Sequence, residues 1–236
     1  MPKSPWMKLL ESQNSGAIPC DQPVLLKRMV ETAYWRRLYA KNRGNLGNAH
    51  YLHFYTGHFG IDLEEYRDRR ILDIGCGPRG SLEWAGIAKE RVGIDPLVDQ
   101  YRRLGINAHG MHYINAASEQ IPFPDEYWDF VSCFNALDHV DEVDATLSEI
   151  ARVLKHKGIF LLITEINHPP TTTEPHVLTK NLLDLLSQTF FLTYLKYNSI
   201  RSDHDIYQSL REDLPAACSG KSQPSILSAR LVKRQS

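Results

Sequence analysis

The sequence predicts an α/β fold in which a doubly wound, mostly parallel sheet of seven strands, the final one antiparallel, carries a helical cap at its N-terminus. Three observations predict this class. After residue 69, short apolar runs alternate with helical patterns. Several of these runs are apolar without interruption, as in parallel strands that are buried on both faces. A glycine-rich turn directly follows the first run.

Composition excludes several classes of protein. The chain has 236 residues, of which 42% are hydrophobic and 23% charged, as in an ordinary globular domain. Its 27 basic and 28 acidic side chains give a net charge of -1, which provides no overall field for nucleic acid or a membrane surface. The longest apolar run, residues 159–163, is too short to cross a bilayer, and the N-terminus has no apolar signal core. Four widely separated cysteines fit a reducing, cytoplasmic location.

Two units are expected along the chain. Residues 1–69 form the cap or lid, with helices over 21–42, where apolar residues recur at three- and four-residue steps, and over 48–58. Residues 70–236 form the sheet domain. Its expected strands are 70–74, 91–95, 111–115, 128–134 and 158–166, its expected helices 82–87, 97–104, 143–154 and 178–186. Residues 190–197 and 226–232 are expected to be two last, antiparallel strands, separated by an irregular insertion over 201–224.

The glycine turn indicates a nucleotide-type ligand. Residues 75–80 fit G-x-G-x-x-G between a strand and a helical pattern, and Asp95 closes the next strand, where a carboxylate can accept ribose hydroxyls. Asp73 stands two residues before the turn. A carboxylate there would repel a pyrophosphate but suits a cationic ligand. Together, these two acids favour an adenosine cofactor with a sulfonium centre, an amino group and no phosphate.

Several blocks make the sequence resemble the class I S-adenosylmethionine-dependent methyltransferases of the small-molecule type. The blocks are residues 71–78, 92–96, 118–125, 128–131, 137–140 and 149–155 with Gly158. The resemblance implies a Rossmann-like domain that binds S-adenosylmethionine. The cofactor-binding residues that it implies are Asp73, Gly75, Cys76, Gly77, Pro78, Asp95, Pro96, Ser118, Glu119 and Asn135.

Each implied residue has an expected role. Asp73 and the glycine-turn backbone would hold the methionine end, and Asp95 the ribose. Pro96 would flank the adenine, Ser118 and Glu119 would meet its edge, and Asn135 would bind the amino group. The sequence departs from the family at Ala117, where many relatives have an acid that accepts the adenine amino group.

Catalytic candidates follow the fourth expected strand. His139 is the expected general base, because an imidazole titrates near neutral pH, and Asp138 is its orienter or an alternative base. The competing interpretation gives His139 only a structural role. His50, His53 and His58 cluster on the cap helices, but they lack an obvious carboxylate partner, so no metal is expected.

Methyl transfer to a small-molecule or glycan-like acceptor, producing S-adenosylhomocysteine, is therefore the expected function. The segment after the fourth strand, Phe134-Asn135-Ala136-Leu137, differs from the Asn-Pro-Pro-Tyr turn that resembles methylation of nucleic-acid bases. Two alternatives remain: an NAD(P)-dependent oxidoreductase, and a catalytically silent S-adenosylmethionine-binding regulatory protein. The acceptor atom, the use of a base and the oligomeric state stay open.

Overall fold

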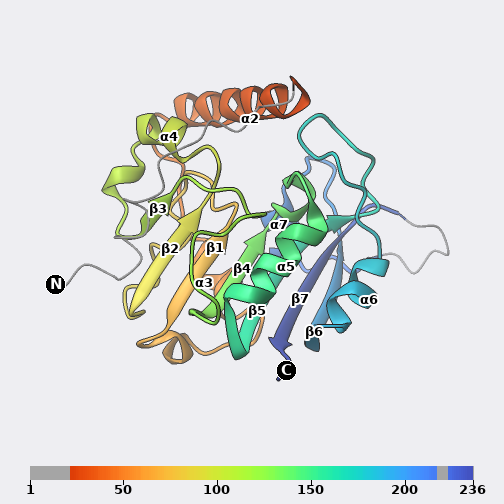
Figure 1. Cartoon of the computed structure of the whole chain (residues 1–236). Helices are drawn as coiled ribbons and strands as arrows, with labels where there is room; N and C mark the ends of the chain where they lie inside the picture. The colour runs from red at the N-terminus through yellow and green to blue at the C-terminus, as the bar shows by residue number, and fades with distance from the viewer. Residues whose placement is uncertain (1–21, 217–222, 236) are drawn as a thin grey trace.

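A seven-stranded mixed sheet forms the centre of the computed structural model, which describes residues 22–216 and 223–235 (Figure 1). The strand order is β3-β2-β1-β4-β5-β7-β6, with β1 to β5 parallel and β7 antiparallel to both of its neighbours. The predicted fold class and the antiparallel final strand are confirmed. The strands are β1 (Arg70–Ile74), β2 (Glu90–Ile94), β3 (His112–Ile114), β4 (Trp128–Phe134), β5 (Leu154–Ile166), β6 (Phe190–Ser199) and β7 (Ser225–Lys233).

The helices match the predicted pattern less closely. The α-helices are α2 (Gln22–Lys41), α3 (Tyr51–Tyr55), α4 (Val98–Tyr101), α5 (Val143–Val153), α6 (Asn181–Ser187) and α7 (Ile206–Arg211). The 3-10 turns are η1 (Leu63–Tyr66), η2 (Arg102–Leu104), η3 (Ile106–Ala108) and η4 (Leu137–His139). Helix α7 lies inside the stretch predicted to be irregular, where the Asp205 side chain caps it by accepting from the Gln208 N–H at 2.9 Å. Residues 217–222 of that stretch are outside the described part.

The predicted helix over residues 82–87 is wrong. This segment is a series of turns between β1 and β2. Leu82 and Ala85 are fully buried, so the apolar spacing reflects packing rather than a helical turn. The Arg91 guanidinium holds the turns, since it donates to the carbonyls of Leu82 and Glu83 at 3.2 and 2.6 Å.

Apolar side chains form a core on each face of the sheet. Leu72 and Ile74 of β1 point to one face, where α5 and α6 pack, whereas Ile71 points to the other. On the Ile71 face, α3 contributes the fully buried Phe54 and Tyr55. Segment 51–66 is thus part of the sheet's core, and the predicted boundary at residue 69 stays a prediction.

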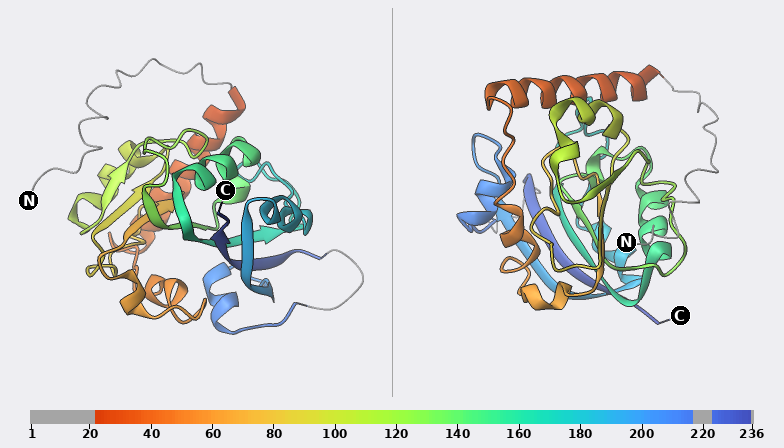
Figure 2. Two further views of the ribbon diagram at one scale, coloured as in Figure 1. Left: turned by 60° about the horizontal axis from the view of Figure 1, so that its bottom comes forward. Right: turned by 90° about the vertical axis from the view of Figure 1, so that its left-hand side faces the viewer.

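Helix α2 crosses the carboxyl edge of the parallel strands (Figures 1 and 2). The prediction of an amphipathic helix is wrong about its buried face: Lys27 is its one buried side chain, whereas Leu25 and Met29 are 52% and 61% exposed. The helix docks through Lys27, Glu31 and Trp35, which share one face at four-residue steps and contact the turns that follow β4 and β1. No described helix is both long and apolar enough to span a membrane.

Candidate functional site

The glycine turn lies directly after β1, at the carboxyl edge of the sheet. The N–H groups of Gly75 and Cys76 donate to the Ile94 carbonyl of β2 at 2.9 and 3.2 Å. Gly75 has φ +65°, and a Cβ there would lie 2.4 Å from the Ala136 Cβ. Only glycine allows this approach, which brings the turn against the segment that follows β4. The glycine turn after β1 and the segment after β4 are thus in direct contact within the candidate site.

Asp73 lies within the sheet beside this turn, only 3% exposed. Its two carboxylate oxygens accept from Ser132 Oγ at 2.6 Å and from Ser81 Oγ at 2.5 Å. Burial raises the pKa of Asp73 to about 6, although the serine hydroxyls and Tyr55 oppose the shift. Burying an ionised carboxylate at this depth is costly even with these hydrogen bonds, and a cationic ligand would lower that cost.

Asp95 directly follows β2 and is 7% exposed. Its carboxylate accepts from the N–H groups of Leu97 at 2.8 Å and Gly77 at 3.1 Å. Burial raises the pKa of Asp95 to about 6, against these backbone hydrogen bonds. Trp35 of α2 packs closely on Gly77: a Cβ added to Gly77 would lie 3.2 Å from the Trp35 ring. The centroids of the Trp35 and Tyr101 rings are 6.3 Å apart. Helix α2 therefore covers the residues around Asp95.

Asn135 offers a buried hydrogen-bond acceptor beside the glycine turn. It follows β4 with a left-handed φ of +51°, a conformation that asparagine tolerates better than most residues. Its Oδ1 is buried and has no hydrogen-bond partner among the described residues. A buried acceptor of this kind fits the amino group of an adenosine donor. Together with Asp73, Asp95 and the glycine turn, it is a suitable set of groups for S-adenosylmethionine.

The remaining predicted cofactor residues are placed less directly. Cys76 and Pro78 are buried in the turn, and Pro96 follows Asp95 half-buried. Ser118 Oγ is 2.8 Å from Thr146 Oγ1 of α5. Glu119 Oε1 accepts from the N–H groups of Asp141 and Glu142 at 2.7 and 3.0 Å, at the start of α5. Contacts to adenine by Ser118 and Glu119 stay a prediction.

His139 lies in η4, the 3-10 turn that follows β4 and Asn135. Its Nδ1 is 3.0 Å from Glu31 Oε1 of α2. Its Nε2 is buried, has no hydrogen-bond partner in the described part of the chain, and lies 3.6 Å from Glu174 Oε1. Burial would lower the pKa of His139, but Glu31, Asp138 and Glu174 outweigh burial and raise it. Lys27 donates to the His139 carbonyl at 2.5 Å and fixes the same turn to α2.

The orienting group differs from the expected one. Asp138 is 3% exposed, its Oδ1 has no partner among the described residues, and burial raises its pKa. Glu31, which the sequence analysis did not identify, is the carboxylate bonded to His139. No local spacing signal links residues 31 and 139, because only the path of α2 across the sheet brings them together.

The cap histidines do not converge. His58 Nε2 is 2.9 Å from Ser228 Oγ, and the His50 ring packs on Tyr207, 4.9 Å between centroids. Burial lowers the pKa of both His50 and His58 to about 4. These side chains are packing elements of the face that α3 covers.

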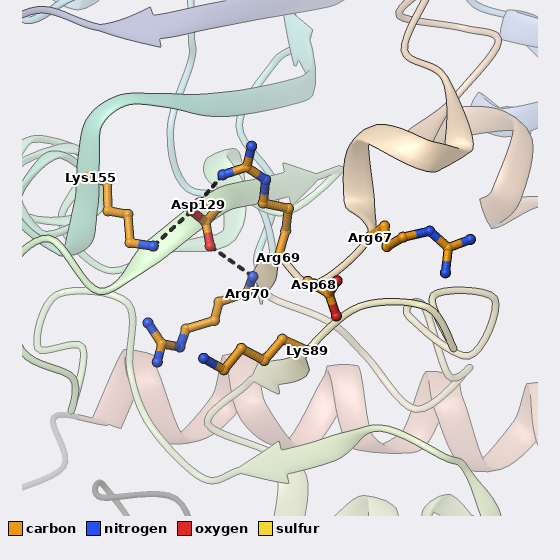
Figure 3. Close-up of a pocket in the computed structure, with 7 residues that line it drawn as sticks. All are labelled: Arg67, Asp68, Arg69, Arg70, Lys89, Asp129 and Lys155. Atoms are coloured by element: carbon orange, nitrogen blue, oxygen red, sulfur yellow. Dashed lines mark hydrogen bonds and ion pairs between the residues drawn. The ribbon is translucent and has the colours of Figure 1, made fainter.

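A pocket of about 280 Å³ lies elsewhere, at the amino ends of the strands (Figure 3). Asp129 on its floor already accepts from Lys155 Nζ at 2.7 Å and from the Arg70 N–H at 2.9 Å. Because parallel α/β sheets bind ligands at their carboxyl ends, the glycine-turn edge is the candidate site despite its more closed surface. The pocket's lining residues are Arg67, Asp68, Arg69, Arg70, Lys89, Asp129 and Lys155.

Comparison with known proteins points to one enzyme class. The methyltransferase domain family matches residues 72–162. The uncharacterized methyltransferase YcgJ of Bacillus subtilis (strain 168) is 26% identical over 151 residues, covering 57% of this chain and 60% of that protein. Its crystal structure superimposes with a TM-score of 0.54 at 18% identity, covering 74% of this chain and 97% of that one, which shows the shared fold.

Two further relatives carry more specific names. The ubiquinone/menaquinone biosynthesis C-methyltransferase UbiE of Vibrio campbellii is 29% identical over 175 residues, covering 66% of this chain and 61% of that protein. The ubiquinone biosynthesis O-methyltransferase of Rhodopseudomonas palustris is 33% identical over 100 residues, covering 40% of this chain and 39% of that protein. The chain thus spans about three fifths of the length of YcgJ and UbiE.

Proposed function

Because the chain belongs to the class I S-adenosylmethionine-dependent methyltransferases, we propose that it transfers the methyl group of S-adenosylmethionine to a hydroxyl oxygen of a small-molecule or glycan-like acceptor. The observation that carries this proposal is the His139 imidazole. It lies in the segment that touches the glycine turn, is held at Nδ1 by Glu31, and keeps a buried Nε2 without a hydrogen bond.

The donor half of the site supports the cofactor. Asp95 would hold the ribose hydroxyls, and Asn135 Oδ1 would accept from the amino group. The buried Asp73 carboxylate would favour the positive charge of the methionine end. When bound, S-adenosylmethionine supplies a methyl group on a positively charged sulfur, which leaves as the neutral sulfide of S-adenosylhomocysteine.

The acceptor half supports a hydroxyl substrate. The carboxylates around His139 raise its pKa and so strengthen it as a base. In the neutral tautomer with the proton on Nδ1, held by Glu31, Nε2 would carry the lone pair that takes the acceptor proton. The acceptor oxygen then forms a bond to the methyl carbon as the carbon–sulfur bond breaks, its electron pair staying on sulfur. Alignment of donor and acceptor at near-attack distance, worth up to about 7 to 11 kcal/mol in the best systems, would contribute more than the base itself.

Charge around His139 selects among acceptors. Burial, together with the nearby Glu174 carboxylate, raises the pKa of Asp138 and of Glu165. These carboxylates disfavour an anionic acceptor, so we infer a neutral or cationic one. The names of UbiE and the Rhodopseudomonas enzyme, which place their methylation in quinone biosynthesis, support a small molecule.

The oxidoreductase alternative has less support. Dinucleotide-binding sheets of this type commonly have the parallel order 3-2-1-4-5-6, whereas here β7 inserts antiparallel between β5 and β6. Asp73 is also poorly suited to a neighbouring pyrophosphate.

Two measurements test the proposal. Calorimetric titration with S-adenosylhomocysteine, NAD and NADP should show saturation only with the first, and tight binding of a nicotinamide cofactor alone would end the proposal. Incubation with methyl-labelled S-adenosylmethionine and a panel of neutral hydroxylated metabolites and sugars should label an acceptor. Labelling that His139→Ala leaves at the wild-type rate would exclude the base, and no labelling of any acceptor would favour the silent regulatory protein.

A further inference from the structure

A second group of ligand-type side chains lies beyond His139, where β5 ends. Glu165, His168 and His204 each offer one ligand atom, and these atoms lie within 4.8 Å of one another. Glu165 is in β5, His168 follows that strand, and His204 lies in the turn between β6 and α7. The sequence separates His204 from the other two by more than thirty residues, so the grouping arises only in the folded chain.

Glu165 is the buried member of this group. Its side chain is 2% exposed, and Oε1 is 2.9 Å from His204 Nε2. Its other oxygen, Oε2, is buried and has no hydrogen-bond partner among residues 22–216 and 223–235. The ion pair with His204, whose side chain is 49% exposed, involves Oε1 and leaves Oε2 unsatisfied. A buried, unpaired carboxylate oxygen is costly unless a ligand coordinates it.

Backbone geometry holds the two histidines in place. Asn167, just before His168, has φ +57°, and His204 itself has φ +58°. Left-handed backbone is uncommon outside glycine and concentrates at functional sites. Arg201 fixes the second turn, because its carbonyl accepts from the His204 N–H at 3.0 Å and its guanidinium pairs with Asp203 at 3.0 Å. The imidazoles are thus set at an edge-to-face angle of 61°, with 5.4 Å between ring centroids.

We propose that Glu165, His168 and His204 bind one divalent first-row transition-metal cation. Two imidazole nitrogens and one carboxylate suit iron(II), cobalt or zinc better than manganese, magnesium or calcium, which prefer oxygen ligands. The 2.9 Å between Glu165 Oε1 and His204 Nε2 equals the spacing of adjacent ligands about 2.0 to 2.1 Å from one octahedral ion. Three protein ligands leave coordination positions open to solvent or substrate.

The position of this site suggests its use, which rests on the proposed function. Glu174 lies between the two groups: its Oε2 is 3.7 Å from His168 Nδ1, and its Oε1 is 3.6 Å from His139 Nε2. An acceptor whose reacting hydroxyl faces His139 would place a neighbouring oxygen toward the cation. The hydroxyl proton passes to His139, the oxygen bonds to the methyl carbon, and the broken carbon–sulfur bond leaves its electron pair on sulfur. The cation orients the acceptor and is neither oxidised nor reduced. The acceptor class is therefore a molecule with two adjacent oxygen atoms.

Metal binding is tested without turnover. Chelator-treated full-length protein is titrated with MnCl2, with free manganese measured by electron paramagnetic resonance, and with CoCl2, followed by visible absorption. Wild type should bind one equivalent, and Glu165→Gln and His204→Ala should each weaken binding by at least about tenfold. His156→Ala is the matched control, because His156 forms an equally close pair with Glu126, 2.7 Å apart, away from the site. Its affinity should equal that of wild type.

Folding and function are separated by a second measurement. Each variant is titrated with S-adenosylhomocysteine, whose affinity should stay at the wild-type value because none of the three residues lies on the donor half. His204→Ala, in an exposed turn, provides the answer if Glu165→Gln does not fold. Absence of a saturable site for either manganese or cobalt in wild type, or equal cobalt affinity in wild type and His204→Ala, would overturn the metal site. Metal binding without methyl transfer would instead count against the proposed function alone.

Discussion

Asp95 offers the sharpest test of the donor site, because its environment makes cofactor binding depend on pH. Its carboxylate already accepts two backbone N–H groups, from Leu97 and Gly77, and is almost completely buried. The Tyr101 hydroxyl makes a third, longer contact with it at 3.5 Å. A carboxylate has room for about four hydrogen bonds, so a ribose hydroxyl would take the remaining position and a second one would replace the long Tyr101 contact. Asp95→Asn keeps the size of the side chain but removes its charge and half of its acceptor capacity.

The size of the effect follows from the pKa of about 6 that burial imposes. Ribose hydroxyls donate to the ionised form, so binding favours deprotonation and affinity falls as the pH drops below the pKa of the free protein. With that pKa, about nine tenths of Asp95 is ionised at about pH 7 and about one tenth at about pH 5. The Asp95 contribution to the affinity for S-adenosylhomocysteine should therefore fall about tenfold over this range, equivalent to ~1.4 kcal/mol. Protonation of Asp73, whose pKa burial also raises to about 6, adds to this fall in wild type.

Calorimetry with S-adenosylhomocysteine across this pH range measures the effect. At neutral pH, Asp95→Asn should bind about tenfold to a hundredfold more weakly, as expected for losing hydrogen bonds to a charged group. Asp73→Asn is the matched control: burial also raises the pKa of Asp73 to about 6, so this variant should keep the Asp95 contribution to the pH dependence. Parallel pH profiles for wild type and Asp95→Asn, or unchanged affinity at neutral pH, would refute the ribose assignment.

Three further variants test other parts of the site. Ser132→Ala removes a 2.6 Å hydrogen bond to buried Asp73 and should lower the free energy of unfolding by about 1 to 3 kcal/mol, measured by urea unfolding at neutral pH. A loss no larger than that from replacing an exposed serine would contradict this. Gly75→Ala, with φ +65° and a Cβ 2.4 Å from that of Ala136, should weaken S-adenosylhomocysteine binding by at least about tenfold, since the left-handed backbone alone costs roughly 1 to 2 kcal/mol; wild-type affinity would show that the turn can shift freely. Lys27→Met loses the contacts that dock α2 and should speed amide hydrogen exchange in α2 but not in β4; equal exchange in both would show that Lys27 does not hold the helix.

The sheet could be predicted from sequence because its strands are short apolar runs between turn residues. The predicted strand over residues 128–134 has the bounds of β4, and the two last strands pair as expected. The helix expected over residues 82–87 could not be distinguished from turns, because burial of Leu82 and Ala85 gives the same three-residue spacing in either conformation.

The donor and acceptor halves differ in how far local sequence reveals them. Asp73, the glycine turn and Asp95 are close in sequence and lie at adjacent strand ends, so motif spacing was enough to group them. Glu31, in contrast, meets His139 only because α2 crosses the sheet edge. No sequence period could reveal a contact that depends on where a remote helix docks.

The same docking gives α2 a consequence for kinetics. One end of the helix contacts the residues around Asp95 through Trp35, while Lys27 and Glu31 contact the turn that carries His139. On the proposed function, spent cofactor and methylated product would both leave beside this one helix, so we expect their release to be coupled. The order in which the two substrates enter is expected to be fixed, with departure of the second product limiting the steady-state rate.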